Sequence, residues 1–234
     1  MGINRNLYIV ADGLGGAGKD TVLKNLKEYF LEKGYRVILT FEPGGTPKAD
    51  ELRAELFEPK KNGAITFAEE LDCVFAARAM NMREIVLPAL MSLEPTVVLK
   101  GRDYLSSFIY QAASGASRDL LLKYYRNEYE LVGFPRPDLR LLLLLSTDEA
   151  MRRRYGAGFD GDGFDMQSKE YWQRVAMGYY NEAMDIARSQ GIFWRETKVV
   201  DARRPVEVVC GEARRIVDEF CFELPEGRVK GWYK

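Results

Sequence analysis

Five short runs of apolar residues divide the chain, and each run carries apolar residues at consecutive positions. The runs are Leu7–Ala11, Arg36–Phe41, Thr96–Lys100, Leu139–Leu145 and Lys198–Ala202. A strand of this kind is buried on both faces, as in a parallel sheet between two layers of helices. The run of leucines could also form a buried helix, but its short length and the preceding segment PRPD favour a strand.

Helical patterns fill the gaps between these runs. They cover Lys19–Lys33, Thr66 to about Leu93, Ser106–Val132, Ser168–Gln190 and Pro205–Phe220. Gly34 and Gly191 are typical residues to follow a helix end, Pro88 predicts a kink, and Gly115 predicts a break. Strands that alternate with helices predict an α/β fold with a doubly wound, five-stranded parallel sheet. We expect residues 1–234 to form a single domain.

The segment GLGGAGKDTV, Gly13–Val22, links the first apolar run to the first helix. It satisfies the pattern G-x-x-x-x-G-K at Gly13, Gly18 and Lys19. Between a strand and a helix, such a loop wraps phosphate with its backbone N–H groups, and the lysine reaches the β- and γ-phosphates. A glycine-rich turn by chance would not place all these parts in register. The loop residues expected to bind the nucleotide are Gly13, Gly15, Gly16, Ala17, Gly18, Lys19, Asp20 and Thr21.

Asp20 stands where this pattern has a serine or threonine that ligates magnesium. A carboxylate oxygen is also a good ligand for Mg²⁺, so we expect Asp20 to be the metal ligand. The hydroxyl of Thr21 is a second possible ligand. Alternatively, Asp20 only favours the positive end of the helix, and both interpretations can hold together.

Composition restricts the chemistry and the partners. The net charge is −1 with no basic block, so nothing favours duplex DNA or an anionic membrane as a partner. The chain has no histidine, and its chemistry must therefore use carboxylates, lysine, arginine and metal. Its three cysteines lack the spacing of a metal site and predict free thiols in a reducing compartment. No apolar run is long enough to span a membrane, and we expect a cytoplasmic protein.

Four further stretches occur in a recognisable order. They are TFEPGGTPKADELR (Thr40–Arg53), FAARAMNMREIVLPAL (Phe75–Leu90), GRDYLSSFIYQ (Gly101–Gln111) and PDLRLLLLL (Pro137–Leu145). Together with the phosphate loop and VVDARRPVEVV near the C-terminal end, they resemble the thymidylate kinase family over about the whole chain. The resemblance implies a P-loop kinase fold, transfer of the γ-phosphoryl of ATP to thymidine monophosphate (dTMP) with Mg²⁺, and a homodimer.

The resemblance also implies roles for residues around the acceptor. Glu42 matches the acid of the family's R-E-P-G-G stretch, Arg53, Arg78 and Arg102 match arginines around the acceptor phosphate, and Tyr110 and Gln111 match the pair that faces the nucleoside. Guanidinium groups suit this role because they offer paired donors and neutralise charge between two anions. Arg78 lies in the apolar run CVFAARAM, where an unpaired charge would be costly.

Two acidic residues of the family are missing. Gly15 stands where the family usually has an aspartate that reaches the acceptor sugar. Gly101 stands where the D-R-Y type motif has its aspartate. Asp103 lies two positions later, and whether it compensates stays open at this point.

The residues expected near the base differ as well. Phe41 replaces the arginine before Glu42, and Val74 stands where an aromatic residue usually stacks on the base. Phe75 follows one position late, which turns a side chain by about 100° around a helix. We take Phe75 as a substrate-binding residue and Phe41 as another candidate for stacking.

The flexible lid expected at about residues 152–168 has three aspartates in YGAGFDGDGFDMQ but no arginine. The family places a catalytic arginine in the phosphate loop or in the lid, and here the loop has none. Only Arg152, Arg153 and Arg154 precede the lid. We take Arg153 as a catalytic cation together with Lys19 and Arg102; the alternative is a solvated helix face. The segment DGDGFD lacks the twelve-residue loop of a calcium site.

These features predict an ATP- and Mg²⁺-dependent kinase that converts dTMP to dTDP, with small-molecule nucleotides as its ligands. Two alternatives remain open. The acceptor could be another pyrimidine nucleotide or a nucleoside, because three of the altered positions bear on the acceptor. The chain could also bind nucleotides with little or no turnover, because the lid arginine and the aspartate at position 101 are absent.

Overall fold

The computed structural model describes residues 5–61, 65–156 and 167–222. Within them, five strands form one sheet in the order β2-β3-β1-β4-β5, and every pairing is parallel. The strands are β1 (Leu7–Gly13), β2 (Arg36–Phe41), β3 (Thr96–Gly101), β4 (Leu139–Leu144) and β5 (Thr197–Asp201). The predicted five-stranded parallel sheet is confirmed, whereas the boundaries 1–234 of a single domain stay a prediction.

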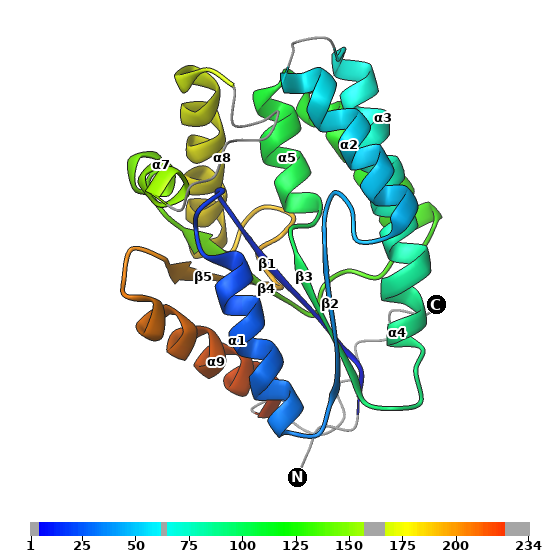
Figure 1. Cartoon of the computed structure of the whole chain (residues 1–234), viewed down its shortest axis with the longest axis vertical. Coiled ribbons are helices and arrows are strands. Elements are labelled where there is room, and N and C mark those ends of the chain that lie inside the picture. The colour runs from blue at the N-terminus through cyan, green and yellow to red at the C-terminus, as the bar shows by residue number, and fades with distance from the viewer. Residues whose placement is uncertain (1–4, 62–64, 157–166, 223–234) are drawn as a thin grey trace.

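Helices cover both faces of the sheet (Figure 1). They are α1 (Lys19–Glu32), α2 (Pro47–Lys61), α3 (Phe67–Asn81), α4 (Leu87–Leu90), α5 (Tyr104–Ala113), α6 (Arg118–Arg126), α7 (Thr147–Gly156), α8 (Lys169–Ala187) and α9 (Val206–Phe222), with the π-helical turns η1 (Met82–Val86) and η2 (Asn127–Leu131). α1 and α9 pack against each other, and α1 also packs on β1, β2 and β3.

The side chains of β1 show how the two layers form. Leu7 and Ile9 belong to the hydrophobic core that contains Leu26 of α1, whereas Tyr8 and Val10 belong to a second core with Val86. Since alternate residues of a strand point to opposite faces, α1 and the η1–α4 segment lie on opposite sides of the sheet. The consecutive apolar residues of β1 are therefore buried on both faces, as expected.

The long helix predicted from Thr66 is divided into three parts. α3 begins after Thr66, whose hydroxyl and the Glu69 carboxylate form a capping box. The π-helical turn η1 follows, and Pro88 falls in the first turn of α4, where a missing backbone N–H needs no partner. The predicted kink at Pro88 stays a prediction, and a π-helical turn lies immediately before this residue.

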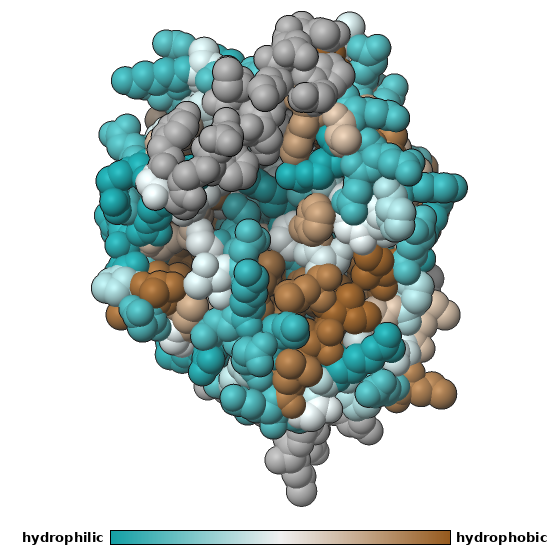
Figure 2. Space-filling view, viewed as in Figure 1, coloured by the Kyte–Doolittle hydropathy of each residue, from teal (hydrophilic) through white to brown (hydrophobic). Residues whose placement is uncertain are grey.

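The carboxyl ends of β1, β2 and β3 meet at one edge of the sheet, the place where parallel α/β folds bind ligands. β2 is the outer strand, and Figure 2 shows apolar side chains gathered over the region that it occupies in Figure 1. Leu39 is 40% exposed and Phe41 is 43% exposed. Among the described helices, none has the length and apolar character needed to cross a bilayer.

Candidate active site

A cavity of about 800 Å³ lies at the carboxyl ends of these three strands. The predicted site residues that line it are Gly15, Gly16, Gly18, Lys19, Asp20, Thr21, Glu42, Arg53, Arg78, Arg102, Tyr110, Gln111 and Arg153. Gly13, Ala17 and Phe75 are not part of its lining. The structure thus brings the expected donor and acceptor residues, from distant parts of the chain, to one cavity.

The phosphate loop has the backbone that its glycines predict. Gly13 has φ 137°, and a Cβ there would lie 2.4 Å from the carbonyl oxygen of Leu143 on β4. Gly18 adopts a left-handed conformation immediately before α1. Lys19 curls back along the loop, where its Nζ donates to the carbonyl oxygens of Gly13 (3.1 Å) and Leu14 (2.8 Å). The loop and the start of α1 therefore have the shape and the backbone N–H groups of a site that suits phosphate, beside the lysine.

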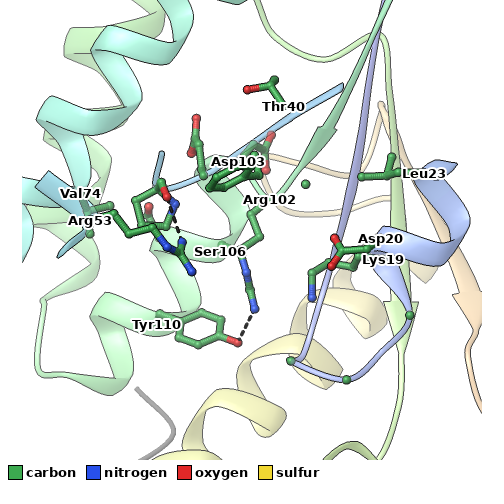
Figure 3. Close-up of a pocket in the computed structure, with 18 of the residues that line it drawn as sticks. Lys19, Asp20, Leu23, Thr40, Arg53, Val74, Arg102, Asp103, Ser106 and Tyr110 are labelled. Carbon is green, nitrogen blue, oxygen red and sulfur yellow. Dashed lines mark hydrogen bonds between the residues drawn. The ribbon is translucent and has the colours of Figure 1, made fainter. Parts of the chain in front are cut away.

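Asp20 lies in the first turn of α1 with an exposed side chain, and Thr21 beside it is exposed too. Both line the cavity, and Figure 3 shows Asp20 beside Lys19 at the start of α1. Burial and the nearby Arg102 lower the pKa of Lys19, while Asp12 and Asp20 act in the opposite direction. Within the described part of the chain, no three Cys, Asp or Glu side chains gather into a metal site. A cation at Asp20 would therefore need further ligands, such as phosphate oxygens and water.

Asp12 is a site residue that sequence reasoning missed. It is completely buried near the end of β1, and its Oδ1 accepts from the Gly13 N–H, the Ser106 hydroxyl and the Tyr179 hydroxyl, each at 2.7 Å. Burial raises the pKa of Asp12. An acid inside an apolar strand directly before the loop is the signal that could have found it. Asp12 ties the phosphate loop to α5 and α8.

Arg102 lies at the centre of the cavity. Its backbone is left-handed with φ 69°, an unfavourable conformation for arginine, and its N–H donates to the carbonyl oxygen of Ala11. Its Nη1 donates to Ser106 Oγ (3.0 Å) and its Nη2 to the Tyr110 hydroxyl (3.1 Å). Figure 3 shows the guanidinium between Tyr110 and the end of Lys19. Arg102 is thus aimed at the space between the phosphate loop and α5.

A buried charge network lies beside this space. Arg78 Nε donates to Glu42 Oε2 (2.8 Å), its Nη2 donates to Ser107 Oγ (2.7 Å), and its Nη1 lies 3.6 Å from Glu128 Oε2. Lys100, which sequence reasoning did not select, pairs with the other oxygen of Glu42. Nε and Nη2 of Arg78 are therefore held by protein groups, whereas its Nη1 makes no hydrogen bond among the described residues.

The far wall of the cavity carries Arg53 and aromatic rings. Arg53 of α2 donates to the carbonyl oxygen of Pro43 (2.9 Å), and its guanidinium carbon lies 4.1 Å from the centre of the Phe57 ring and 5.6 Å from that of Phe41. Phe57 was another residue that sequence reasoning missed. Gln111 lines the cavity too.

Phe75 lies in the core instead of the cavity. Its ring stacks on Tyr124 with centres 4.2 Å apart and planes 8° apart, and it also packs on Tyr104. Val74 lines the cavity in its place. The shift of one position along α3 has turned the aromatic ring away, so the expectation that Phe75 faces the substrate does not agree with its position.

Asp103 does not replace the acid missing at Gly101. Its carboxylate pairs with the buried Arg140 and accepts from the Leu105 N–H at the start of α5. Both carboxylate oxygens of Asp103 therefore contact Arg140, and these contacts connect β4 to the start of α5. These contacts give Asp103 a structural role, although the residue also lines the cavity.

The three arginines of α7 differ in their surroundings. Arg152 and Arg153 both pair with Glu149, at 2.7 and 2.8 Å, whereas Arg154 lies against the phosphate loop at Gly15. Residues 152–156 of the predicted lid are thus helical, and its glycine-rich part, 157–166, lies outside the described residues.

Comparison with known proteins agrees with this geometry. Residues 11–212 match the model of the family described as thymidylate kinase. The thymidylate kinase of Symbiobacterium thermophilum is 35% identical over 92% of this chain and 94% of its own length. The thymidylate kinase of Syntrophotalea carbinolica is 34% identical over 88% of this chain and 92% of its own length. The crystal structure of the Ehrlichia chaffeensis thymidylate kinase, 23% identical, has the same fold, with a TM-score of 0.68 over 91% of this chain and 99% of that chain. The chain belongs to the thymidylate kinase family.

Proposed function

We propose that this protein transfers the γ-phosphoryl group of ATP to dTMP and releases ADP and dTDP. One observation carries the proposal: Arg102 lies between the phosphate loop with Lys19 and the acceptor wall with Arg53 and Tyr110. A cavity with cationic groups between two binding regions suits the meeting of two phosphates. The family membership supports the same activity.

Positioning and charge stabilisation are sufficient for this reaction. The loop amides and Lys19 would hold the donor phosphates, and Arg102 would neutralise charge as the acceptor phosphate approaches the γ-phosphorus in line. Ser106 and Tyr110 hold the Arg102 guanidinium in place. The absence of histidine is therefore no obstacle, since phosphoryl transfer needs little proton chemistry from the protein.

Asp20 and Thr21 would hold Mg²⁺. The exposed carboxylate of Asp20 lies in the cavity at the start of α1, and oxygen ligands suit this ion. When bound, the ion neutralises charge on the donor phosphates.

A second candidate function is the same reaction with a different pyrimidine nucleotide or a nucleoside as acceptor. It is favoured by the positions of Val74, Phe41 and Phe57. Val74 leaves an aliphatic surface where the family stacks an aromatic ring, while Phe57 and Phe41 flank Arg53 instead. The base would then contact a different set of side chains. This would change the ranking of acceptors but not the transfer chemistry.

The family membership also supports a homodimer, and the three free cysteines suit the reducing cytoplasm. Light scattering of the purified protein at several concentrations tests the dimer. A monomer at all concentrations would reject it.

An acceptor panel tests the function. ADP release is measured with ATP and Mg²⁺ and with dTMP, dUMP, dCMP, dAMP or thymidine as acceptor. We expect the highest kcat/KM with dTMP. A higher value with another pyrimidine acceptor supports the second candidate. ATP binding without transfer to any acceptor would contradict both and would indicate a nucleotide-binding protein.

A further inference from the structure

Asp12 and Arg102 lie at the same level of two neighbouring strands. Ala11 of β1 pairs with Gly101, the last residue of β3, and Asp12 and Arg102 are the residues that follow this pair. The Arg102 N–H donates to the carbonyl oxygen of Ala11 at 2.9 Å, and the backbone of Arg102 is left-handed, with φ 69°. The backbone of the arginine is thus fixed beside Asp12.

Two hydroxyl groups lie between the carboxylate of Asp12 and the guanidinium of Arg102. Ser106 of α5 and Tyr179 of α8 each donate to Asp12 Oδ1 at 2.7 Å. Arg102 Nη1 donates to the same two hydroxyl oxygens, at 3.0 Å to Ser106 and at 3.4 Å to Tyr179. The hydroxyl groups therefore connect the carboxylate to the guanidinium.

The direction of these hydrogen bonds follows from the groups involved. An ionised carboxylate only accepts, a guanidinium only donates, and a hydroxyl group has one proton to give. The protons of Ser106 and Tyr179 are therefore directed at Asp12, and their lone pairs are directed at Arg102. The two hydroxyl oxygens lie 3.1 Å apart, but neither has a second proton for a bond between them. The charge of Asp12 thus orients both hydroxyl groups toward the arginine.

The burial of Asp12 would be costly if the residue served packing alone. Asp12 is completely buried, and its Oδ2 has no hydrogen-bond partner among the described residues. Burial and the charge of Asp103 raise the pKa of Asp12, whereas Arg102, Tyr179 and Ser106 lower it. A buried carboxylate with one unpartnered oxygen needs a compensating cation, and Arg102 supplies it. The carboxylate and the guanidinium therefore stabilise each other.

Asp12 and Tyr179 lie behind the cavity. Arg102 and Ser106 line the cavity, whereas Asp12 and Tyr179 are not part of its lining. Asp12 Oδ1 also accepts from the Gly13 N–H of the phosphate loop. An effect of Asp12 on a bound ligand must therefore pass through Arg102 or through the loop, and Tyr179 can separate these two routes.

We propose that Asp12 is a positioning residue for phosphoryl transfer: it holds Arg102 through the hydroxyl groups of Ser106 and Tyr179. The network fixes the guanidinium between the phosphate loop and α5, where the transferred group would pass. This inference rests on the proposed kinase function. It explains why an acid lies inside an otherwise apolar strand, since the position requires a negative charge and not only a side chain of this size.

Tyr179→Phe tests the arginine route alone, because it leaves the bond between Asp12 and the Gly13 N–H in place. With ATP and the best acceptor of the panel, kcat should fall about tenfold, the scale of a hydrogen bond to a charged group. The Kd of ATP should change by less than about twofold, since the loop is not altered. Tyr180→Phe, at the next position of α8 and 41% exposed, is the matched control and should leave kcat unchanged. An unchanged kcat of Tyr179→Phe would overturn the proposal.

A double-mutant cycle tests the link between the charge of Asp12 and Arg102. Asp12→Asn keeps the size of the side chain, removes its charge and should lower kcat at least about tenfold. In the Arg102→Ala background the same substitution should lower kcat by less than about twofold, because the group that it positions is gone. Equal losses in the two backgrounds would overturn the proposal. Tyr179→Phe, measured in the same two backgrounds, replaces Asp12→Asn in the cycle if that variant does not fold.

NMR of protein with ¹⁵N-labelled arginine observes the guanidinium without any turnover. Resolved Nη–H signals require a guanidinium that hydrogen bonds keep from rotating, and the signals of Arg102 are identified by their loss in Arg102→Ala. We expect them to be resolved in the parent and lost in Tyr179→Phe and Asp12→Asn. Arg140, which Asp103 holds, is the internal control and should keep its signals in every variant.

These spectra separate the inference from the proposed function. Signals of Arg102 that are absent from the parent, or unchanged in both variants, would overturn the role of Asp12 whether or not turnover occurs. A parent protein that loses these signals in the two variants but phosphorylates no acceptor would instead reject the proposed function alone.

Discussion

The guanidinium of Arg78 donates a hydrogen bond of 2.8 Å to the carboxylate of Glu42, and the two side chains are only 3% and 4% exposed. Arg78→Ala would leave Glu42 with Lys100 alone and Glu128 without its nearest cation. Breaking a buried ion pair from one side costs about 3–5 kcal/mol, and we expect a loss of this size in urea denaturation. The affinities for dTMP and thymidine should then fall together.

Arg53 provides the comparison for this prediction. It is half-buried, and its contacts include the carbonyl oxygen of Pro43 and the ring of Phe57. Arg53→Ala should lower the free energy of unfolding less than Arg78→Ala does. It should weaken the binding of dTMP more than the binding of thymidine, because charge-assisted contacts to phosphate are lost. If Arg78→Ala is the variant that selectively weakens dTMP, the guanidinium of Arg78 must leave Glu42 to bind the phosphate.

Lys19→Ala should abolish turnover and preserve the fold. Among the described residues, the ammonium group donates to the carbonyl oxygens of Gly13 and Leu14 and forms no ion pair, so its loss breaks no direct contact with a carboxylate. We expect kcat to fall at least about 100-fold, as for other groups that stabilise charge in the transition state. Lys27→Ala on the same helix is the matched control. A Lys19→Ala protein with most of its activity would show that the loop does not hold the donor phosphates.

The sequence predicted the sheet and the phosphate loop because their signals are local. Consecutive apolar residues marked β1. The phosphate-loop pattern of Gly13, Gly18 and Lys19 could be recognised from the strand before it and the helix after it. The predicted C-terminal end of α1 was also close to the observed one, since Gly34 lies just after the helix and has a left-handed backbone. In contrast, α2 was missed because proline and glycine at its start obscured its helical pattern.

The acceptor side was harder to predict because its contacts join distant segments. The pairing of Asp103 with Arg140 and of Lys100 with Glu42 depends on how β3 lies beside β1 and β2. The distinction between Arg153 and Arg154 depends on the direction of α7 relative to the phosphate loop. No pattern along the chain encodes either relationship.

Glu128 should make stability depend on pH. Burial raises its pKa to about 7, and the folded state therefore retains a proton that the unfolded state, with an ordinary glutamate, loses near pH 4.5. Its contribution to stability is present below about pH 4.5 and is lost as pH rises to about 7. Since one pKa unit corresponds to about 1.4 kcal/mol, the total loss is about 3 kcal/mol. Glu128→Gln should remove this decline in a series of urea titrations.

Glu149 supplies the control for this series. Hydrogen bonds from Arg152 and Arg153 lower its pKa to about 2, so it stays ionised in both states above its ordinary pKa. Glu149→Gln should leave unchanged the slope of the free energy of unfolding against pH between pH 4.5 and 7. The idea of a buried, protonated Glu128 fails if Glu128→Gln keeps the slope of the parent protein.

Asp20 should make ATP binding depend strongly on Mg²⁺. Its exposed carboxylate lies at the start of α1 beside the phosphate loop, where it would repel a triphosphate unless a cation lies between them. Asp20→Ser removes this charge and restores a hydroxyl ligand. We expect it to bind ATP about tenfold more tightly than the parent in a chelator, and to keep part of its activity with Mg²⁺.

Asp20→Ala separates the metal ligand from the helix terminus. It should share the tighter binding of metal-free ATP, because the negative charge is gone, but it should lose turnover, because neither a carboxylate nor a hydroxyl remains at this position. Calorimetry with ATP in Mg²⁺ and in a chelator, combined with ADP release, measures both quantities for the three proteins. Full Mg²⁺-dependent activity of Asp20→Ala would show that the carboxylate is not a required ligand. The interaction of Asp20 with the positive end of α1 would then be the reason for an acid at this position.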